Sequence, residues 1–241
     1  MSLEKQLLIL SEDIYELPNP QLALDDPEGL SAIGGDLTTE RLIHLYQHGF
    51  FPWYSDADPI LWWHPAQRCQ LLPYEFHLSK SLKKHTKRFS GSIKINTAFH
   101  ETIQYCRQQR QEMEGTWISN DIQQAFTLLH KLGFAHSIEV WKDESLIGGL
   151  YGIALGEFFF GESMFSLEAN ASKLALHSLC LNADILGIKY IDCQVESDHL
   201  MSLGARLIPR NDFIQQLKQA IPTKCKNTEL LKIDQLNFKV E

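Results

Sequence analysis

Residues 148–166 read GGLYGIALGEFFFGESMFS and residues 189–195 read KYIDCQV, and these two stretches decide the fold. Both are apolar enough to form core strands. Between them, residues 171–186 carry a helical pattern that ends at Gly187, where glycine favours a helix terminus. Upstream, residues 137–141 (SIEVW) begin a meander whose short turns predict antiparallel pairing. We therefore expect a mixed sheet in which a helix leads into the last core strand.

Polar side chains interrupt both apolar stretches. Strand side chains alternate with a period of two, so Tyr190, Asp192 and Gln194 are predicted on one face of their strand. Glu162 follows a run of phenylalanines at a glycine-flanked strand end. Burying a carboxyl group and an amide side by side costs several kcal/mol unless partners satisfy them. Taken alone, these residues leave two interpretations open, a structural hydrogen-bond pair and a reaction site.

The composition is that of a soluble globular protein. The 241 residues are 44% hydrophobic and 22% charged, which allows one large domain or a domain with a smaller module. No apolar run approaches the roughly 20 residues of a membrane span, and residues 1–10 lack the pattern of a signal peptide. The cysteines are odd in number, scattered and without a C-x-x-C pair, which argues against a zinc ribbon or a disulfide framework and favours a reducing cytosol. They are Cys69, Cys106, Cys180, Cys193 and Cys225.

The net charge of −8 hides a strongly basic segment. Residues 80–88 read KSLKKHTKR and contain no acid. On a helix the cations of this segment recur at spacings of three and four and form one basic stripe, made of Lys80, Lys83, Lys84, Lys87 and Arg88. The stripe is either an ordinary solvated face or a local rail for a phosphate backbone, while the acidic remainder discourages nonspecific binding.

The N-terminal quarter of the chain differs from the rest. It contains proline-rich turns and a predicted helix near residues 39–48. Aromatic residues then cluster between prolines in residues 50–63, where they form either an interdomain hydrophobic seam or a stacking wall for a base or an aromatic ring. We place a boundary near Pro65. We expect a small N-terminal α/β module in residues 1–65 and a larger domain in residues 66–241.

The predicted elements after the boundary end in the order meander, helix, strand, short helix, strand. This order is similar to that of the GNAT acyltransferase superfamily, whose members splay two neighbouring strands and bind an acyl donor in the gap. Members that use coenzyme A carry a Q/R-x-x-G-x-G/A loop, whose backbone N–H groups hold the pyrophosphate. Residues 165–173 read FSLEANASK and contain no glycine. We therefore predict an α+β fold with a GNAT-like mixed-sheet domain, and an acyl donor other than acetyl coenzyme A.

Eight motifs occur in order along the chain: GGDL (34–37), GFFPWY (49–54), PILWW (59–63), AHSIEVW (135–141), GGLYG (148–152), GESMFS (161–166), ASK (171–173) and IDCQV (191–195). Together they resemble the leucyl/phenylalanyl-tRNA–protein transferase family over the chain as far as about Arg210. The resemblance implies a small N-terminal module packed on a GNAT-like domain, in a bacterial cytosolic enzyme. It also implies that Leu or Phe moves from its tRNA to the α-amine of a protein that begins with Arg or Lys, which marks that protein for degradation.

The resemblance implies that Asp192, Gln194 and Glu162 form the catalytic set, without a metal or a cofactor. The reaction is aminolysis of an activated ester, and a free α-amine with a pKa near ~8 needs no strong activation. An amide holds no extra proton near neutrality, so Gln194 can only accept a hydrogen bond from the amine and aim it. Asp192 can fix the Gln194 amide or relay the proton, and Glu162 can neutralise the acceptor's cationic side chain or hold its amine.

The donor needs an apolar slot and a platform for the terminal adenosine. For the slot we expect Phe159, Met164 and Leu179, since methionine adapts to the shapes of both Leu and Phe. For the adenosine platform we expect Trp53 and Trp117. The basic stripe is the expected contact with the tRNA. The expected partners are thus aminoacyl-tRNA and a protein or peptide with N-terminal Arg or Lys, bound by a monomer, and no membrane partner is expected.

The chain departs from the family pattern at two positions. Leu167 stands where an Arg is usual after GESMFS, and His64 replaces the Ser of WWSP. Residues 223–241 lie outside the motifs, and we interpret them as a lineage-specific extension. Two other classes stay open: an acyl coenzyme A N-acyltransferase, which the missing glycine loop disfavours, and a non-catalytic tRNA-binding module, which the paired polar strand residues disfavour.

Overall fold

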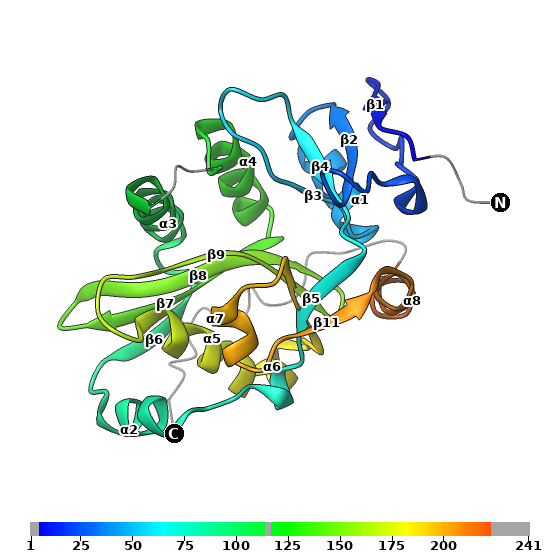
Figure 1. The fold of residues 1–241 in the computed structure, drawn as a ribbon. Helices are drawn as coiled ribbons and strands as arrows, with labels where there is room; N and C mark the ends of the chain where they lie inside the picture. Colours follow the sequence, from blue (N-terminus) through cyan, green and yellow to red (C-terminus); the bar gives the residue numbers. More distant parts are fainter. Residues whose placement is uncertain (1–4, 114–116, 223–241) are drawn as a thin grey trace.

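The computed structural model describes residues 5–113 and 117–222. In this part of the chain, two β-sheets are surrounded by eight α-helices and two short 3-10 helices, Pro20–Leu22 and Pro73–Glu75 (Figure 1). The tail from residue 223, which we interpreted as an extension, lies outside the described residues.

The smaller sheet is built from the N-terminal part of the chain. Its strands lie in the order β1-β2-β4-β3. β1 (Leu8–Leu10) pairs in parallel with β2 (Leu30–Gly34), whereas β3 (Phe51–Pro52) and β4 (Leu61–Trp63) pair antiparallel. The helix predicted near residues 39–48 is confirmed as α1 (Thr39–Gln47), which connects β2 to β3.

The larger sheet has seven strands in the order β11-β5-β10-β9-β8-β7-β6. β9 and β10 are parallel and every other neighbouring pair is antiparallel, so the predicted mixed sheet and its meander (β7, β8, β9) are confirmed. The bounds are β5 Gln67–Leu71, β6 Ser92–Ile95, β7 Ala135–Lys142, β8 Ser145–Leu155, β9 Phe158–Ser166, β10 Tyr190–Gln194 and β11 Arg206–Pro209. β5, which lies beside the strand that carries Asp192, was not predicted from the sequence.

Helices cover both faces of the larger sheet. α3 (Phe99–Met113) and α4 (Asn120–Lys131) lie on one face, and α5 (Ala171–Leu181) with α6 (Ala183–Leu186) lies on the other (Figure 1). The remaining helices are α2 (Lys80–Arg88), α7 (Asp198–Ser202) and α8 (Arg210–Ala220). Local sequence sets some of these ends: at α4, the Ser119 hydroxyl accepts a hydrogen bond from the backbone N–H of Ile122 at 3.1 Å.

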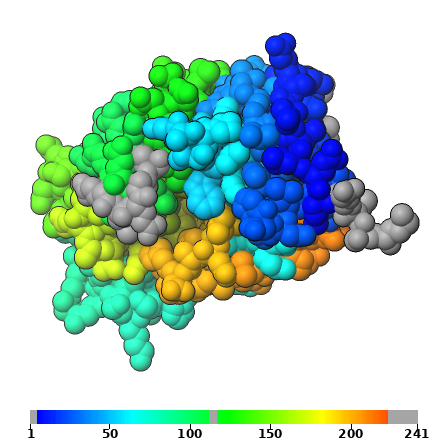
Figure 2. Space-filling model, turned by 45° about the horizontal axis from the view of Figure 1, so that its top comes forward, coloured from blue at the N-terminus to red at the C-terminus, as the bar shows by residue number. Residues whose placement is uncertain are grey.

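The buried apolar residues form two cores, one on each side of the larger sheet. The first core lies under α3 and α4 and includes residues of both sheets, such as Trp62 and Phe158, together with Phe213 of α8. The second core lies between the sheet and α5. Because the first core crosses from the N-terminal part to the larger sheet, the two parts bury apolar surface against each other. In Figure 2, the blue and cyan atoms of the N-terminal part accordingly lie against the green and orange atoms of the rest.

Two details of the predicted elements are wrong. The single helix predicted over residues 171–186 is interrupted at Asn182, whose side-chain amide donates to the carbonyl of Ser178 at 2.8 Å and competes with the helical bonds. The strand predicted over residues 189–195 ends at Gln194, because the register shifts between Asp192 and Gln194 and Gln194 adopts a positive φ of 57°. This bulge breaks the alternation on which the shared face of Asp192 and Gln194 was predicted.

Candidate active site

The parallel strands β9 and β10 separate part-way along their length, and a cavity lies in the gap. Their pairing is limited to Phe158–Phe160 with Tyr190–Asp192. Beyond it, Glu162 on β9 and Gln194 on β10 line a cavity of about 330 Å³. Pro52 and Trp53 of the N-terminal part also line it, so both parts of the chain form its wall.

One half of the cavity is apolar. Leu150, Phe159, Met164, Leu176 and Ile191 line it, and all five belong to or pack against the second core. A pocket of this composition suits an aromatic side chain, or an aliphatic one without a branch at Cβ, rather than a charged one.

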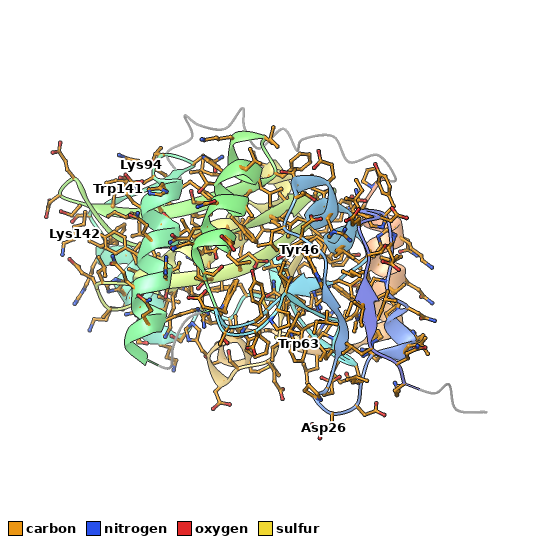
Figure 3. All side chains as sticks on the ribbon, turned by 90° about the horizontal axis from the view of Figure 1, so that it is seen from above. Asp26, Tyr46, Trp63, Lys94, Trp141 and Lys142 are labelled. Carbon is orange, nitrogen blue, oxygen red and sulfur yellow. The ribbon has the colours of Figure 1, made fainter. Side chains whose placement is uncertain are left out.

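The other half is polar and is organised around the buried carboxyl group of Glu162. The hydroxyl of Tyr46 donates to Glu162 Oε1 at 2.8 Å, and the amide Nε2 of Gln194 donates to the same oxygen at 3.2 Å. In Figure 3, Tyr46 lies where the N-terminal helix meets the larger sheet. Burial raises the pKa of Glu162 to about 8, against the lowering effect of the Tyr46 hydrogen bond. At neutral pH this carboxyl group is therefore mostly protonated, on the oxygen that Tyr46 leaves free.

The contact with Glu162 fixes the direction of the Gln194 amide. Its NH₂ end faces Glu162, so its oxygen Oε1 points away, and among the described residues no group donates to that oxygen. Gln194 lies on the cavity wall and is only partly buried. An amide oxygen held in this way can accept an N–H from a nucleophilic amine in the cavity.

Asp192 lies behind Gln194 and is paired with Arg68. The guanidinium donates to both carboxylate oxygens, from Nε at 2.8 Å and from Nη2 at 2.6 Å, and both side chains are fully buried. Phe51 and Phe213 hold the guanidinium, with its central carbon 4.7 and 4.6 Å from their ring centroids. Asp192 Oδ1 also accepts the backbone N–H of Gln194 at 3.0 Å. Asp192 therefore holds the bulged backbone, and it does not contact the Gln194 amide that it was expected to fix.

Two tryptophans flank the cavity mouth. Trp53 is 45% exposed and Trp117 is partly buried, and both line the cavity. The indole N–H of Trp63 donates to the carbonyl of Trp53 at 2.6 Å, and the two rings lie 5.7 Å apart, so Trp63 supports Trp53 from behind. Exposed rings held in this way can stack on a planar ligand group.

The described residues contain neither a metal cluster nor a spanning helix. In residues 5–113 and 117–222, no group of three or more His, Cys, Asp or Glu side chains is placed to hold a metal ion. Within the same residues, each helix is too short or too polar to cross a bilayer.

Family models and individual relatives match most of the chain, and they carry the same family name. The family model described as leucyl/phenylalanyl-tRNA protein transferase matches residues 70–218, and the model of the N-terminal domain of that transferase matches residues 35–66. A leucyl/phenylalanyl-tRNA–protein transferase of Shewanella baltica is 50% identical over 215 residues, which cover 89% of this chain and 91% of the relative. One of Saccharophagus degradans is 49% identical over 223 residues, which cover 91% and 92%. The chain belongs to the leucyl/phenylalanyl-tRNA–protein transferase family.

Most of the residues predicted for this family lie together. Glu162, Gln194, Trp53, Trp117, Phe159 and Met164 line one cavity, with Asp192 behind Gln194. Leu179 does not line it: the side chain is 1% exposed and lies in the second core, whereas Leu176, three residues earlier on α5, reaches the cavity. The prediction of Leu179 as a wall residue of the slot is not supported by its position, and Leu176 takes its place.

The structure adds polar residues that the sequence pattern does not indicate. Tyr46 and Arg68 hold Glu162 and Asp192, and Arg110 Nε donates to the hydroxyl of Ser163 on the cavity wall at 2.9 Å. Arg68 is a charged residue in a short strand of mixed polarity, a pattern that gives no signal of burial. Tyr46 looks like any apolar residue on the inner face of a helix.

The five cations of the basic stripe are confirmed on one helix, α2, and all five are exposed while Leu82 and Thr86 face inward. None of them lines the cavity. In Figure 2 the blue-green atoms around this helix project from the lower edge of the molecule.

The two departures from the family pattern lie in different surroundings. Leu167 is 55% exposed at the end of β9. His64 is fully buried between the rings of Phe50 and Phe213, and burial, with the charges of Arg68 and Arg210, keeps the pKa of its imidazole well below the usual value.

Proposed function

We propose that this protein transfers Leu or Phe from aminoacyl-tRNA to the N-terminal α-amine of proteins that begin with Arg or Lys, forming a peptide bond. One observation carries the proposal: the amide oxygen of Gln194 has no partner among the described residues, and Gln194 lines a cavity whose other half is an apolar slot. A nucleophilic amine can be aimed from one half at an ester whose amino acid side chain occupies the other. Family membership and the names of the relatives support the same reaction.

On the donor side, the slot and the tryptophans have separate tasks. The side chain of Leu or Phe enters the apolar half, where Phe159, Met164 and Leu176 adapt to either shape. The terminal adenosine stacks on Trp53 or Trp117 at the mouth. This arrangement presents the ester carbonyl at the border between the two halves.

On the acceptor side, the neutral amine attacks the ester carbonyl carbon. Gln194 Oε1 accepts one amine N–H and holds the nitrogen lone pair toward that carbon. As the C–N bond forms, the ester C–O bond breaks, the departing ribose oxygen takes up a proton, and the amine nitrogen loses one. Glu162, which burial keeps mostly protonated, holds the Gln194 amide and can pass a proton within the site. It is poorly suited to neutralise the acceptor's cationic side chain.

The proposal also assigns roles to α2, to the gap between β9 and β10 and to the two parts of the chain. The basic stripe on α2 binds phosphates of the tRNA. The gap between β9 and β10 supports a GNAT-like arrangement, with residues 1–65 as a small module and residues 66–241 as the transferase domain. We propose that the protein acts as a cytoplasmic monomer on a tRNA and a protein, and that it requires no cofactor.

The test is transfer of labelled phenylalanine from phenylalanyl-tRNA to a peptide that begins with Arg. We expect transfer to peptides beginning with Arg or Lys and none to an otherwise identical peptide beginning with Ala. Gln194→Ala should lower single-turnover transfer by about 10²-fold, the scale of losing one preorganised hydrogen bond to the reacting group, whereas Gln215→Ala, on the exposed side of α8, should leave it unchanged. Acetyl transfer from acetyl coenzyme A, or tRNA binding without any transfer, would favour the two alternative classes.

A further inference from the structure

The hydroxyl group of Tyr151 is a buried polar group for which the fold provides no partner. Tyr151 lies in β8 and its side chain is 0% exposed. Among the described residues, no group forms a hydrogen bond with its Oη, yet Tyr151 is one of the residues that line the reaction cavity. An unsatisfied buried hydroxyl destabilises a folded protein, so such groups are rare unless something completes them. A ligand in the cavity is the available partner.

The Tyr151 ring is held in place. Phe99 and Phe126 contact it edge to face, with centroids 5.9 and 5.6 Å away. Burial, reinforced by the nearby carboxyl group of Glu162, raises the pKa of the Tyr151 hydroxyl well above its usual value. The group is therefore a neutral, fixed hydroxyl that can both donate and accept a hydrogen bond.

The order of strands places Tyr151 on the far side of Glu162 from Gln194. Gln194 lies on β10, Glu162 and Ser163 lie on β9, and Tyr151 lies on β8, paired with Ser163. β8 and β9 are paired at this level and lie about 4.8 Å apart, whereas β9 and β10 have already separated. If the amine attacks beside Gln194, Tyr151 lies beyond the carbonyl carbon and faces the substituents of the donor's α-carbon.

That α-carbon carries two substituents other than hydrogen and the carbonyl, namely the side chain and the α-amine. The apolar slot for the side chain belongs to the second core, whereas Tyr151 belongs to the first core, on the other side of the sheet. The second oxygen of Glu162, Oε2, also has no partner among the described residues. The Tyr151 hydroxyl, which can accept a hydrogen bond, and the protonated Oε2 of Glu162, which can donate one, match the N–H groups and the lone pair of a neutral amine.

Building on the proposed function, we propose that Tyr151 recognises the free α-amine of the amino acid that is transferred. Its Oη accepts one N–H of this amine, and the protonated Oε2 of Glu162 donates to the lone pair of the amine nitrogen when the donor is bound. Tyr151 thereby selects an aminoacyl ester over a simple acyl ester of the same shape.

The test compares three donors that differ only at the α-carbon: 3′-esters of tRNA with phenylalanine, with phenyllactate, which carries a hydroxyl, and with 3-phenylpropionate, which carries hydrogen. Tyr151→Phe should lower kcat/KM for the phenylalanyl ester by about 10- to 100-fold, the loss expected for one strong hydrogen bond. It should change kcat/KM for the phenylpropionyl ester less than about threefold, because this ester has no α-amine to form a hydrogen bond with Tyr151. Tyr190→Phe, which removes a hydroxyl outside the cavity, serves as the control and should change neither.

The Tm of Tyr151→Phe distinguishes recognition of the donor amine from a structural role of the hydroxyl. Because Tyr151→Phe removes an unpartnered group, its Tm should equal or exceed that of the natural protein. A lower Tm with equal losses for all three esters would overturn the inference, and so would an unchanged rate with the phenylalanyl ester.

A binding measurement keeps the inference independent of turnover. Non-reactive 3′-amide analogues of phenylalanyl- and phenylpropionyl-adenosine can be titrated by calorimetry. We expect the natural protein to bind the amine-bearing analogue more tightly and Tyr151→Phe to lose that preference. If this holds without phenylalanine transfer to an Arg peptide, the proposed function fails and the amine site stands. Equal binding of both analogues by the natural protein contradicts the amine site.

Discussion

At the scale of single residues, the pair of Arg68 and Asp192 changes how the site is understood. Asp192 was expected to act on the Gln194 side chain, but its oxygens are occupied by Arg68 and by the backbone N–H of Gln194. The left-handed backbone of Gln194 is unfavourable for a residue with a side chain. Asp192 accepts the backbone N–H of Gln194 and so stabilises this conformation. We therefore interpret Asp192 as a positioning residue.

A buried charge pair of this kind makes a clear stability prediction. Asp192→Asn leaves the Arg68 guanidinium buried without its counter-charge, so we expect a loss of about 3–5 kcal/mol in the free energy of unfolding. Replacing both residues, as in Arg68→Met with Asp192→Leu, should recover most of that loss while transfer stays low, because the Gln194 N–H has no acceptor. Urea unfolding and single-turnover transfer measure the two effects. An Asp192→Asn variant of unchanged stability without transfer would instead assign Asp192 a direct part in proton movement.

Glu162 predicts a pH dependence of stability. Burial raises its pKa from 4.5 to about 8, so between these values the folded state binds a proton that the unfolded state has lost. Stability contributed by this group therefore falls as pH rises through that window. Glu162→Gln cannot ionise, so its free energy of unfolding relative to the natural protein should rise between pH 5 and pH 8.5 by a few kcal/mol, at about 1.4 kcal/mol per unit. Urea unfolding across this range measures it, with Glu40→Gln, an exposed carboxyl on α1, as the control. A constant difference between the two proteins contradicts the buried, protonated state of Glu162.

At the scale of elements, α2 lies away from the cavity and carries only positive charge on its exposed face. A site that holds only the last nucleotide and its amino acid needs a separate contact for the rest of the tRNA. Lys83→Glu with Lys84→Glu should therefore raise KM for aminoacyl-tRNA and reduce its salt dependence, with little effect on kcat. Lys131→Glu with Lys218→Glu changes the net charge equally on α4 and α8 and is the matched control. If both double variants have the same salt slope, α2 is an ordinary solvated face.

The elements also show what sequence patterns can and cannot predict. The meander and the polar residues Glu162 and Asp192 were predictable, because a carboxyl group in an apolar strand stands out. β5 was not predictable, since its sequence QRCQL is short and mostly polar and its Arg68 is buried only through a partner 124 positions away. Leu176, rather than the predicted Leu179, lines the cavity, and this was not predictable for another reason. α5 is buried on nearly all sides, so no apolar stripe indicates which turn faces the cavity.

At the scale of the whole molecule, the N-terminal part contributes to the reaction site itself. Tyr46 holds Glu162, Phe51 packs against Arg68, and Trp53 lines the cavity. The first core continues across the boundary near Pro65. Trp63, which is labelled with Tyr46 in Figure 3, lies in β4 of the smaller sheet. The proposed division at residue 65 therefore separates two parts that depend on each other for stability.

This dependence gives a prediction about cooperativity. Calorimetry of the full chain should show one unfolding transition whose measured enthalpy equals its van't Hoff enthalpy, because neither part can unfold without exposing the shared core. Expressed alone, residues 66–241 would expose that apolar face, so we expect them to bind a hydrophobic dye, to lose near-UV circular dichroism and to show no transfer. Adding residues 1–65 as a separate chain should restore transfer only at high concentration, since the linked module acts at a high effective concentration. Two resolved transitions in the full chain, or a folded and active 66–241 fragment, would show that the catalytic site forms without the N-terminal part.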